Sequence, residues 1–109
     1  MLVATPQILE DMDYYMPDSI SLEKMSSFFA LFADPSRLKI LSALAISPLC
    51  VTDLAKITQM NQTTVSHQLR ILRDSRVVRP IRLGKILQYK ITNPKINEIL
   101  LVGVECLQN

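Results

Sequence analysis

The chain has 109 residues, of which 49% are hydrophobic, and its 12 basic and 10 acidic side chains give a net charge of +2. This length and composition predict one compact domain, and neither a membrane-spanning run of about 18 apolar residues nor a signal peptide is expected. Two cysteines are too few for a disulfide framework, so the sequence is typical of a cytoplasmic protein.

Catalysis is not expected. The sequence has one histidine, two separated cysteines and two glycines, and it has no glycine-rich loop that could hold a phosphate. An enzyme would need a nucleophile with a nearby base, or a cluster of carboxylates. We therefore expect neither a catalytic site nor a cofactor.

The small net charge hides a strongly polarised chain. Residues 1–34 contain six acidic side chains and one basic side chain, whereas residues 62–95 contain one acidic and eight basic side chains. A basic segment of this kind is the electrostatic footprint of nucleic-acid binding. A solvated basic face without a partner is the alternative.

The N-terminal third of the chain predicts an arm and two helices. Residues 1–17 are acidic and are expected to form an irregular, flexible arm, and residues 18–109 to form the folded domain. A first helix is expected over 19–33. A second is expected over 35–47, after Asp34 as N-cap and with proline at its first position. In the second helix the side chains expected to point inward include Leu38, Leu41, Leu44 and Ala45.

The middle of the chain predicts a helix-turn-helix. A short helix over 51–56 and a turn at 58–60 precede a helix that is capped by Asn61 and runs to Asp74. Apolar Val65, Leu69 and Leu72 lie on one face of this second helix. The opposite face of its first two turns carries hydrogen-bonding groups and one cation, from Gln62, Thr63, Ser66, His67 and Arg70. Such a face suits a DNA major groove, where base edges present donors and acceptors, whereas an ordinary surface helix more often carries Glu and Lys.

A basic hairpin is expected directly after this helix. Residues 77–91 contain two β-favouring runs around Gly84, which is the natural position for a positive φ. Pro80 cannot donate to a ladder, so it belongs at the beginning or the edge of its strand. A hairpin in this position is a wing, and it would lie on phosphates or reach into the adjacent minor groove.

A last helix is expected over 94–107, after Asn93 as N-cap and Pro94. Together the elements predict a mainly α fold with a small β-hairpin (α+β), a winged helix-turn-helix of four helices, two strands and a fifth helix. The last helix is apolar nearly all round, and the first carries a wide apolar stripe of Leu22, Met25, Phe28, Phe29 and Phe32. We therefore expect a homodimer through the first and last helices, with packing of the last helix into its own core as the alternative.

The chain resembles the ArsR/SmtB family of dimeric winged-helix repressors. The resemblance is carried by ADPSRLKIL at 33–41, LCVTDLA at 49–55 and NQTTVSHQLRILRDSRVV at 61–78, followed by GKILQY at 84–89. It implies a symmetric operator in double-stranded DNA, read by two helices about one helical turn apart. The residues that it places on DNA are Gln62, Thr63, Ser66 and His67 in the groove, and Arg82 and Lys85 on the backbone.

The resemblance also raises the question of a sensed signal. One family metal site uses Cys-x-Cys at the start of the third helix, where this chain has Cys50-Val51-Thr52, and Thr52 fits better as the N-cap of that helix. A second site needs Asp and His on the last helix, which has no histidine. We therefore expect no metal site. Cys50 and Cys106 remain candidates for a thiol switch, with a purely structural role as the alternative.

The sequence is thus interpreted as a sequence-specific DNA-binding transcriptional regulator, a dimeric repressor released by an unidentified effector. The alternative is a winged helix that serves only as a protein-interaction module. Such a module would be expected to replace the polar groove-facing side chains with apolar or acidic ones.

Overall fold

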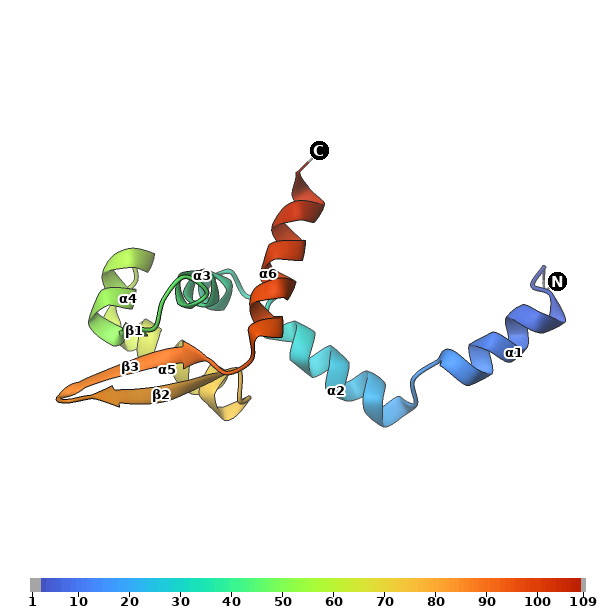
Figure 1. The fold of residues 1–109 in the computed structure, drawn as a ribbon, viewed down its shortest axis with the longest axis horizontal. Helices are drawn as coiled ribbons and strands as arrows, with labels where there is room; N and C mark the ends of the chain where they lie inside the picture. The colour runs from blue at the N-terminus through green and yellow to red at the C-terminus, as the bar shows by residue number, and fades with distance from the viewer. Residues whose placement is uncertain (1–2, 109) are drawn as a thin grey trace.

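The computed structural model describes residues 3–108, which form six helices and a three-stranded antiparallel sheet (Figure 1). The elements are α1 (Pro6–Tyr15), α2 (Ser19–Ala30), α3 (Pro35–Leu44), β1 (Leu49–Cys50), α4 (Val51–Thr58), α5 (Gln62–Asp74), β2 (Val78–Leu83), β3 (Ile86–Ile91) and α6 (Pro94–Leu107). From α2 onward this is the predicted winged helix-turn-helix. Within residues 3–108, no helix is both long enough and apolar enough to cross a membrane.

The hydrophobic core lies where α3, α4 and α5 meet one another and the base of the hairpin. Its buried side chains are Ile40, Leu41, Ala43, Leu44, Leu54, Val65, Leu69, Leu72, Val77, Val78 and Ile96. The three apolar residues predicted for the inner face of α5 are all in this set, at 0–1% exposure. The core therefore fixes which face of α5 is left to solvent.

A tight turn joins α4 to α5. Gln59 adopts a left-handed conformation with φ of 58°, and the Met60 backbone N–H donates to the Ala55 carbonyl at 3.1 Å, which ends α4. Two residues later, Oδ1 of Asn61 accepts a hydrogen bond from the Thr64 backbone N–H at 2.7 Å and starts α5. The predicted N-cap is thus confirmed, and the predicted turn is shorter than expected, because α4 extends to Thr58, two residues beyond its predicted end.

The wing is a regular hairpin at one side of the sheet. The strand order is β1-β3-β2, so β2 with Pro80 lies at the edge, as predicted. Leu83 pairs with Ile86 across a two-residue turn in which Gly84 has φ of 61°. The strand β1 was not expected; it pairs Leu49 with Tyr89 and holds the start of α4 against the hairpin.

The expectation of an irregular arm over residues 1–17 was wrong for residues 6–15, and residues 1–2 lie outside the described part of the chain. Residues 6–15 form helix α1, in which Oγ1 of Thr5 accepts from the Ile8 backbone N–H at 3.3 Å and Pro6 occupies the first turn. This is the same combination of N-cap and proline that begins α3 and α6. The acidic residues in the middle of this segment made it resemble an irregular arm, so the helix start at Thr5 and Pro6 was not recognised.

Three local expectations need correction. The helix α4 begins at Val51 after Cys50, without a side-chain cap, so Thr52 lies inside the helix and is not its N-cap. Leu38 is exposed in the single chain. Helices α2 and α3 end at Ala30 and Leu44, about three residues before their predicted ends, because short-range turns follow each of them.

Helices α2 and α6 project from the body of the fold in different directions (Figure 1). Helix α2 begins at Asp18, whose carboxylate accepts from the Ser21 backbone N–H at 2.7 Å. This hydrogen bond, with a further one from the Ser21 side chain, lowers the pKa of Asp18 below its ordinary value. Both helices expose many apolar side chains: Ile20, Leu22, Met25 and Phe29 on α2, and Leu101, Val102, Val104 and Leu107 on α6.

Candidate nucleic-acid interface

The exposed face of α5 carries all five helix residues that the sequence singles out. The apolar face of α5 is buried in the core, whereas the opposite face of its first two turns is exposed to solvent. There the side chains line one open hollow of about 510 Å³, formed by Gln62, Thr63, Ser66, His67 and Arg70. The hollow is thus surrounded by short hydrogen-bonding groups and one guanidinium, which match the donors and acceptors on base edges.

The wing presents its two predicted cations at its outer end. Arg82 and Lys85 are both exposed, on either side of the Gly84 turn. Side chains alternate along a strand, so Arg82 shares a face of the hairpin with Pro80 and with Tyr89. That is the face turned toward α5, because Tyr89 lines a hollow together with residues of that helix.

This second hollow contains residues that the sequence analysis did not select. It holds about 140 Å³ between α5 and the hairpin, lined by Ser66, Leu69, Arg70, Arg73 and Tyr89. Arg73 lies three residues after Arg70, a spacing that could have indicated a shared face. Tyr89 could not have been found this way, since only the strand register brings it to α5.

The basic side chains of this region are largely free of acidic partners. Among residues 3–108, the single ion pair within 4.0 Å joins Nε of Arg73 to Asp74 at 3.9 Å, and both side chains are half exposed or more. A pair in that setting contributes little. Apart from Arg73, whose pair is weak, the wing and helix cations of this region can therefore meet the phosphates of a duplex without first breaking internal pairs.

A side-chain network ties α5 to the end of α2. The Arg37 guanidinium donates to the carbonyls of Ala30 and Leu31, each at 3.2 Å, and to Oε1 of Gln68 at 3.3 Å. The Gln68 amide in turn donates to Asp34, the N-cap of α3, at 3.4 Å. These contacts place the last turn of α2 and the middle of α5 in a fixed relation. The sequence did not reveal them.

The two cysteines are free thiols on separate elements. Cys50 is half-buried on β1, where it pairs with Gln88, and Cys106 is exposed in the last turn of α6. Within residues 3–108, no three His, Cys, Asp or Glu side chains form a metal-ligating group. The only histidine, His67, lies in the hollow of α5. A thiol switch thus stays a prediction.

Comparison with known proteins gives consistent matches. A family model described as "Bacterial regulatory protein, arsR family" matches residues 34–79. A transcriptional repressor SmtB homolog of Synechocystis sp. is 43% identical over 103 residues, which are 92% of this chain and 78% of the relative.

Solved structures agree with these matches. The crystal structure of AntR, an antimony-specific transcriptional repressor, is 32% identical with a TM-score of 0.79, over 99% of this chain and 96% of that one. A homodimeric winged helix-turn-helix DNA-binding domain from Mycobacterium bovis is 27% identical with a TM-score of 0.72, over 84% of this chain and 89% of that one.

Proposed function

Because the chain belongs to the arsR family of bacterial regulatory proteins, whose relatives are transcriptional repressors, we propose that it acts in the cytoplasm as a dimeric repressor. In this role it binds a two-fold symmetric operator and is released by an effector. One observation carries the proposal: five polar side chains surround a single open hollow on the exposed face of α5, while the core holds the opposite face.

The α5 helix is assigned to the major groove. Gln62, Thr63, Ser66 and His67 would contact base edges, and Arg70, which lines both hollows, would contact the backbone. Arg82 and Lys85 on the wing would contact phosphates. Arg73 joins this set because it lines the hollow between α5 and the hairpin.

The dimer is assigned to α2 and α6. Phe29 is 53% exposed on α2, and Leu101 is 57% exposed on α6. Apolar side chains of α3 and α6, together with Phe32 from the turn after α2, line a groove of about 630 Å³. A surface of this kind marks an interaction site, and the homodimeric relative from Mycobacterium bovis supports a second copy of the chain as its occupant.

Release from DNA would follow from a change in the relative position of the two α5 helices. An effector can drive this change only by binding one dimer geometry more tightly than the other. Cys50 and Cys106 are the candidates for a thiol-based signal. Binding to DNA that is unchanged after treatment with oxidant or persulfide donor would leave both cysteines in a structural role.

A pair of substitutions tests the roles assigned to the wing and to α5. Lys85→Ala should weaken binding to operator and random duplex alike and reduce the slope of log affinity against log salt by about 1. Gln62→Ala should cost about 1–3 kcal/mol on the operator, with relaxed preference at one base pair. Titrations by fluorescence anisotropy at two salt concentrations measure both effects.

Lys39→Ala, an exposed cation on α3 outside both hollows, is the matched control and should leave binding unchanged. Equal effects of Lys85→Ala and Gln62→Ala on the operator and on random DNA would contradict the division of roles. Failure of the unaltered protein to bind any duplex would instead favour the protein-interaction module.

A further inference from the structure

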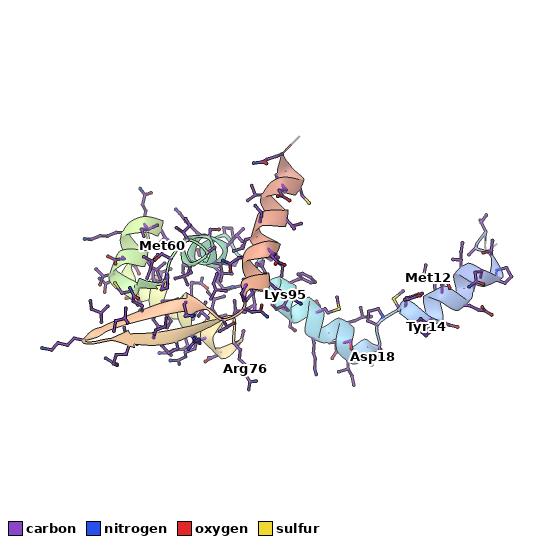
Figure 2. All side chains as sticks on the ribbon, viewed as in Figure 1. Met12, Tyr14, Asp18, Met60, Arg76 and Lys95 are labelled. Atoms are coloured by element: carbon purple, nitrogen blue, oxygen red, sulfur yellow. The ribbon has the colours of Figure 1, made fainter. Side chains whose placement is uncertain are left out.

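Helix α1 is an unpartnered element of this fold. None of its residues is buried, and it extends beyond the N-terminal end of α2, away from the rest of the chain (Figures 1 and 2). Figure 2 places Met12 and Tyr14 on this outlying helix. The resulting molecule is 62 Å long but only 22 Å thick. A helix in this position has no packing energy from its own chain.

Such a helix is not stable without a partner. It has 10 residues, below the roughly 12–15 at which isolated helices become even marginally stable in water. Of its three acidic residues, Glu10 and Asp11 lie in the middle, and Asp13 lies in the last turn, where a negative charge opposes the helix dipole. The cap at Thr5 offsets only part of this cost. Tertiary packing must supply the remainder.

The side chains of α1 show which face would be packed. At 100° per residue, one arc of α1 collects four apolar residues, Ile8, Leu9, Met12 and Tyr15, and apolar Met16 follows directly after the helix. All five are exposed, between 44% for Ile8 and 74% for Tyr15. Tyr14 and the three acids occupy the other side. The helix is thus amphipathic, and its apolar face has no neighbour in the chain.

The position of α1 points to a second copy of the chain as the neighbour. Only Met16, Pro17 and Asp18 separate α1 from α2, the helix assigned to the dimer interface. Exposed apolar side chains are therefore present on both sides of this short linker. The charges also fit, because the acidic arm would approach a domain whose residues 62–95 carry eight basic side chains and one acidic one.

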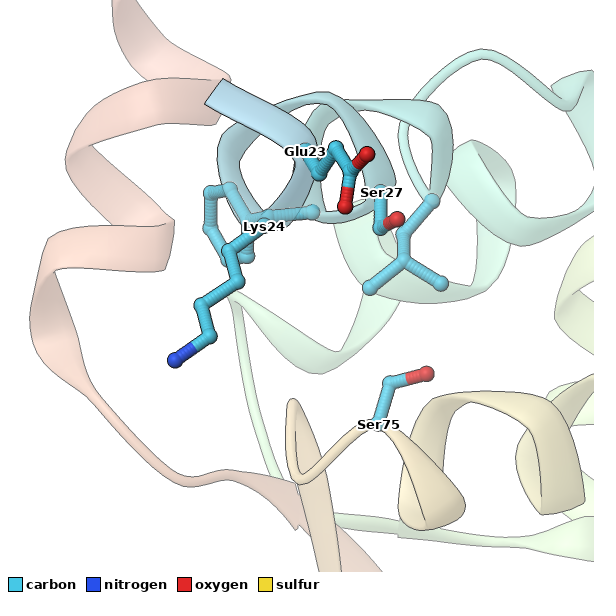
Figure 3. A pocket seen from close by; sticks show the side chains of 6 residues that line it. Glu23, Lys24, Ser27 and Ser75 are labelled. Carbon is cyan, nitrogen blue, oxygen red and sulfur yellow. The ribbon is translucent and has the colours of Figure 1, made fainter. Parts of the chain in front are cut away.

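The groove between α2 and the end of α5 is the matching surface. It holds about 400 Å³ and is lined by Glu23, Lys24, Ser27, Phe28, Leu31 and Ser75. Figure 3 shows Lys24 and Ser27 on α2, with Ser75 facing them from the end of α5. Phe28 and Leu31 give the groove an apolar lining. If the two-fold axis runs perpendicular to α2, the two copies of α2 are antiparallel, and the N-terminal end of one lies beside the C-terminal half of the other, where this groove is.

We propose that α1 of each protomer packs its apolar face into the groove between α2 and α5 of the partner subunit, so that the two copies exchange arms. This inference rests on the dimer of the proposed function. It adds that the arm contacts the end of the partner's recognition helix and so helps to fix the relation of the two helices on DNA.

Disulfide trapping between two singly substituted chains tests the exchange. Both chains carry Cys50→Ala and Cys106→Ser, which remove the native thiols. One chain also carries Met12→Cys, and the other, which is tagged, also carries Ser75→Cys. Under mild oxidation the mixture should give a covalent dimer at least about tenfold faster than the control mixture, in which Tyr14→Cys replaces Met12→Cys. Tyr14 is exposed on the opposite side of the same helix, so the two mixtures differ only in the face that carries the thiol.

A second measurement does not depend on new thiols. Ile8→Ser with Met12→Ser should raise the dimer dissociation constant by about tenfold or more, because two apolar side chains lose their burial. Tyr14→Ser should leave it unchanged. Sedimentation equilibrium reads both, and circular dichroism checks that the domain stays folded.

The outcomes separate this inference from the proposed function. A dimer in sedimentation without preferential trapping through Met12 overturns the arm exchange and leaves the repressor dimer intact. A monomer of the unaltered chain at micromolar concentration overturns both.

Discussion

Arg37 connects the parts of the molecule that have to act together. One guanidinium satisfies two carbonyls at the end of α2 and the Gln68 amide in the middle of α5. The side chain is half-buried, so these acceptors would lose a charged donor without full access to water. The helix assigned to the dimer and the helix assigned to DNA are thus held by the same residue.

We predict that Arg37→Ala lowers the free energy of unfolding by about 1–3 kcal/mol and weakens operator binding, since α5 loses a contact that orients it. Urea unfolding measures the first effect and DNA titration the second. Lys39→Ala, on the exposed side of the same helix, should change stability by no more than about 0.5 kcal/mol. Equal stability losses for the two variants would show that the network contributes nothing.

At the scale of elements, the wing depends on one backbone conformation. Gly84 has φ of 61° in the turn of the hairpin, and a Cβ there would meet no atom within 4 Å. Any cost of a side chain at this position would therefore come from the left-handed backbone and not from a clash.

We predict that Gly84→Ala lowers the free energy of unfolding by about 1 kcal/mol and weakens DNA binding by displacing the wing cations. Lys85→Ala, at the neighbouring position, should weaken binding without loss of stability. Thermal unfolding of the two variants separates backbone strain from lost charge. The account of the turn is wrong if Gly84→Ala is as stable as the unaltered protein.

Much of the element order could be predicted from local signals. The N-cap and proline pairs at Asp34 and Asn93 and the cap at Asn61 mark real helix starts, and the period of α5 separates its buried from its exposed face. The helix α1 was missed although Thr5 and Pro6 carry the same signature. The acids that follow made the arm look irregular.

Two contacts of the candidate site could not be predicted from local sequence signals. Tyr89 reaches α5 only through the pairing of β3, and Arg37 reaches Gln68 over 31 positions of the chain. Neither contact leaves a trace in spacing or composition, because both depend on the three-dimensional packing of separate elements. The exposed hydrogen-bonding face of α5, by contrast, follows from periodicity within one helix.

The molecule as a whole is too extended for an isolated domain of its length. Its radius of gyration is 18.3 Å, against about 13 Å for a compact domain of 100 residues. The excess comes from α1, α2 and α6, the elements that carry most of the exposed large apolar side chains. The extended shape is thus explained by a dimer in which these helices are covered.

We predict that Phe29→Glu combined with Leu101→Glu gives a monomer that retains its helix content and loses at least about 100-fold of its affinity for a two-half-site duplex. Each half-site would then be bound without the gain from the linked second site. Sedimentation equilibrium and DNA titration measure the two effects. Ile57→Glu, at a similarly exposed apolar position on α4, should leave the dimer intact. A dimer that survives both glutamates would contradict the assigned interface.

The most direct test of the central claim is selection of binding sites from a library of random-sequence duplexes by the unaltered protein, read by sequencing. A two-fold symmetric repressor that reads DNA through α5 should enrich a palindromic motif, with half-site centres about 10–10.5 base pairs apart or a multiple of that spacing. Bound duplexes that show no common motif, or a motif without two-fold symmetry, would contradict the account.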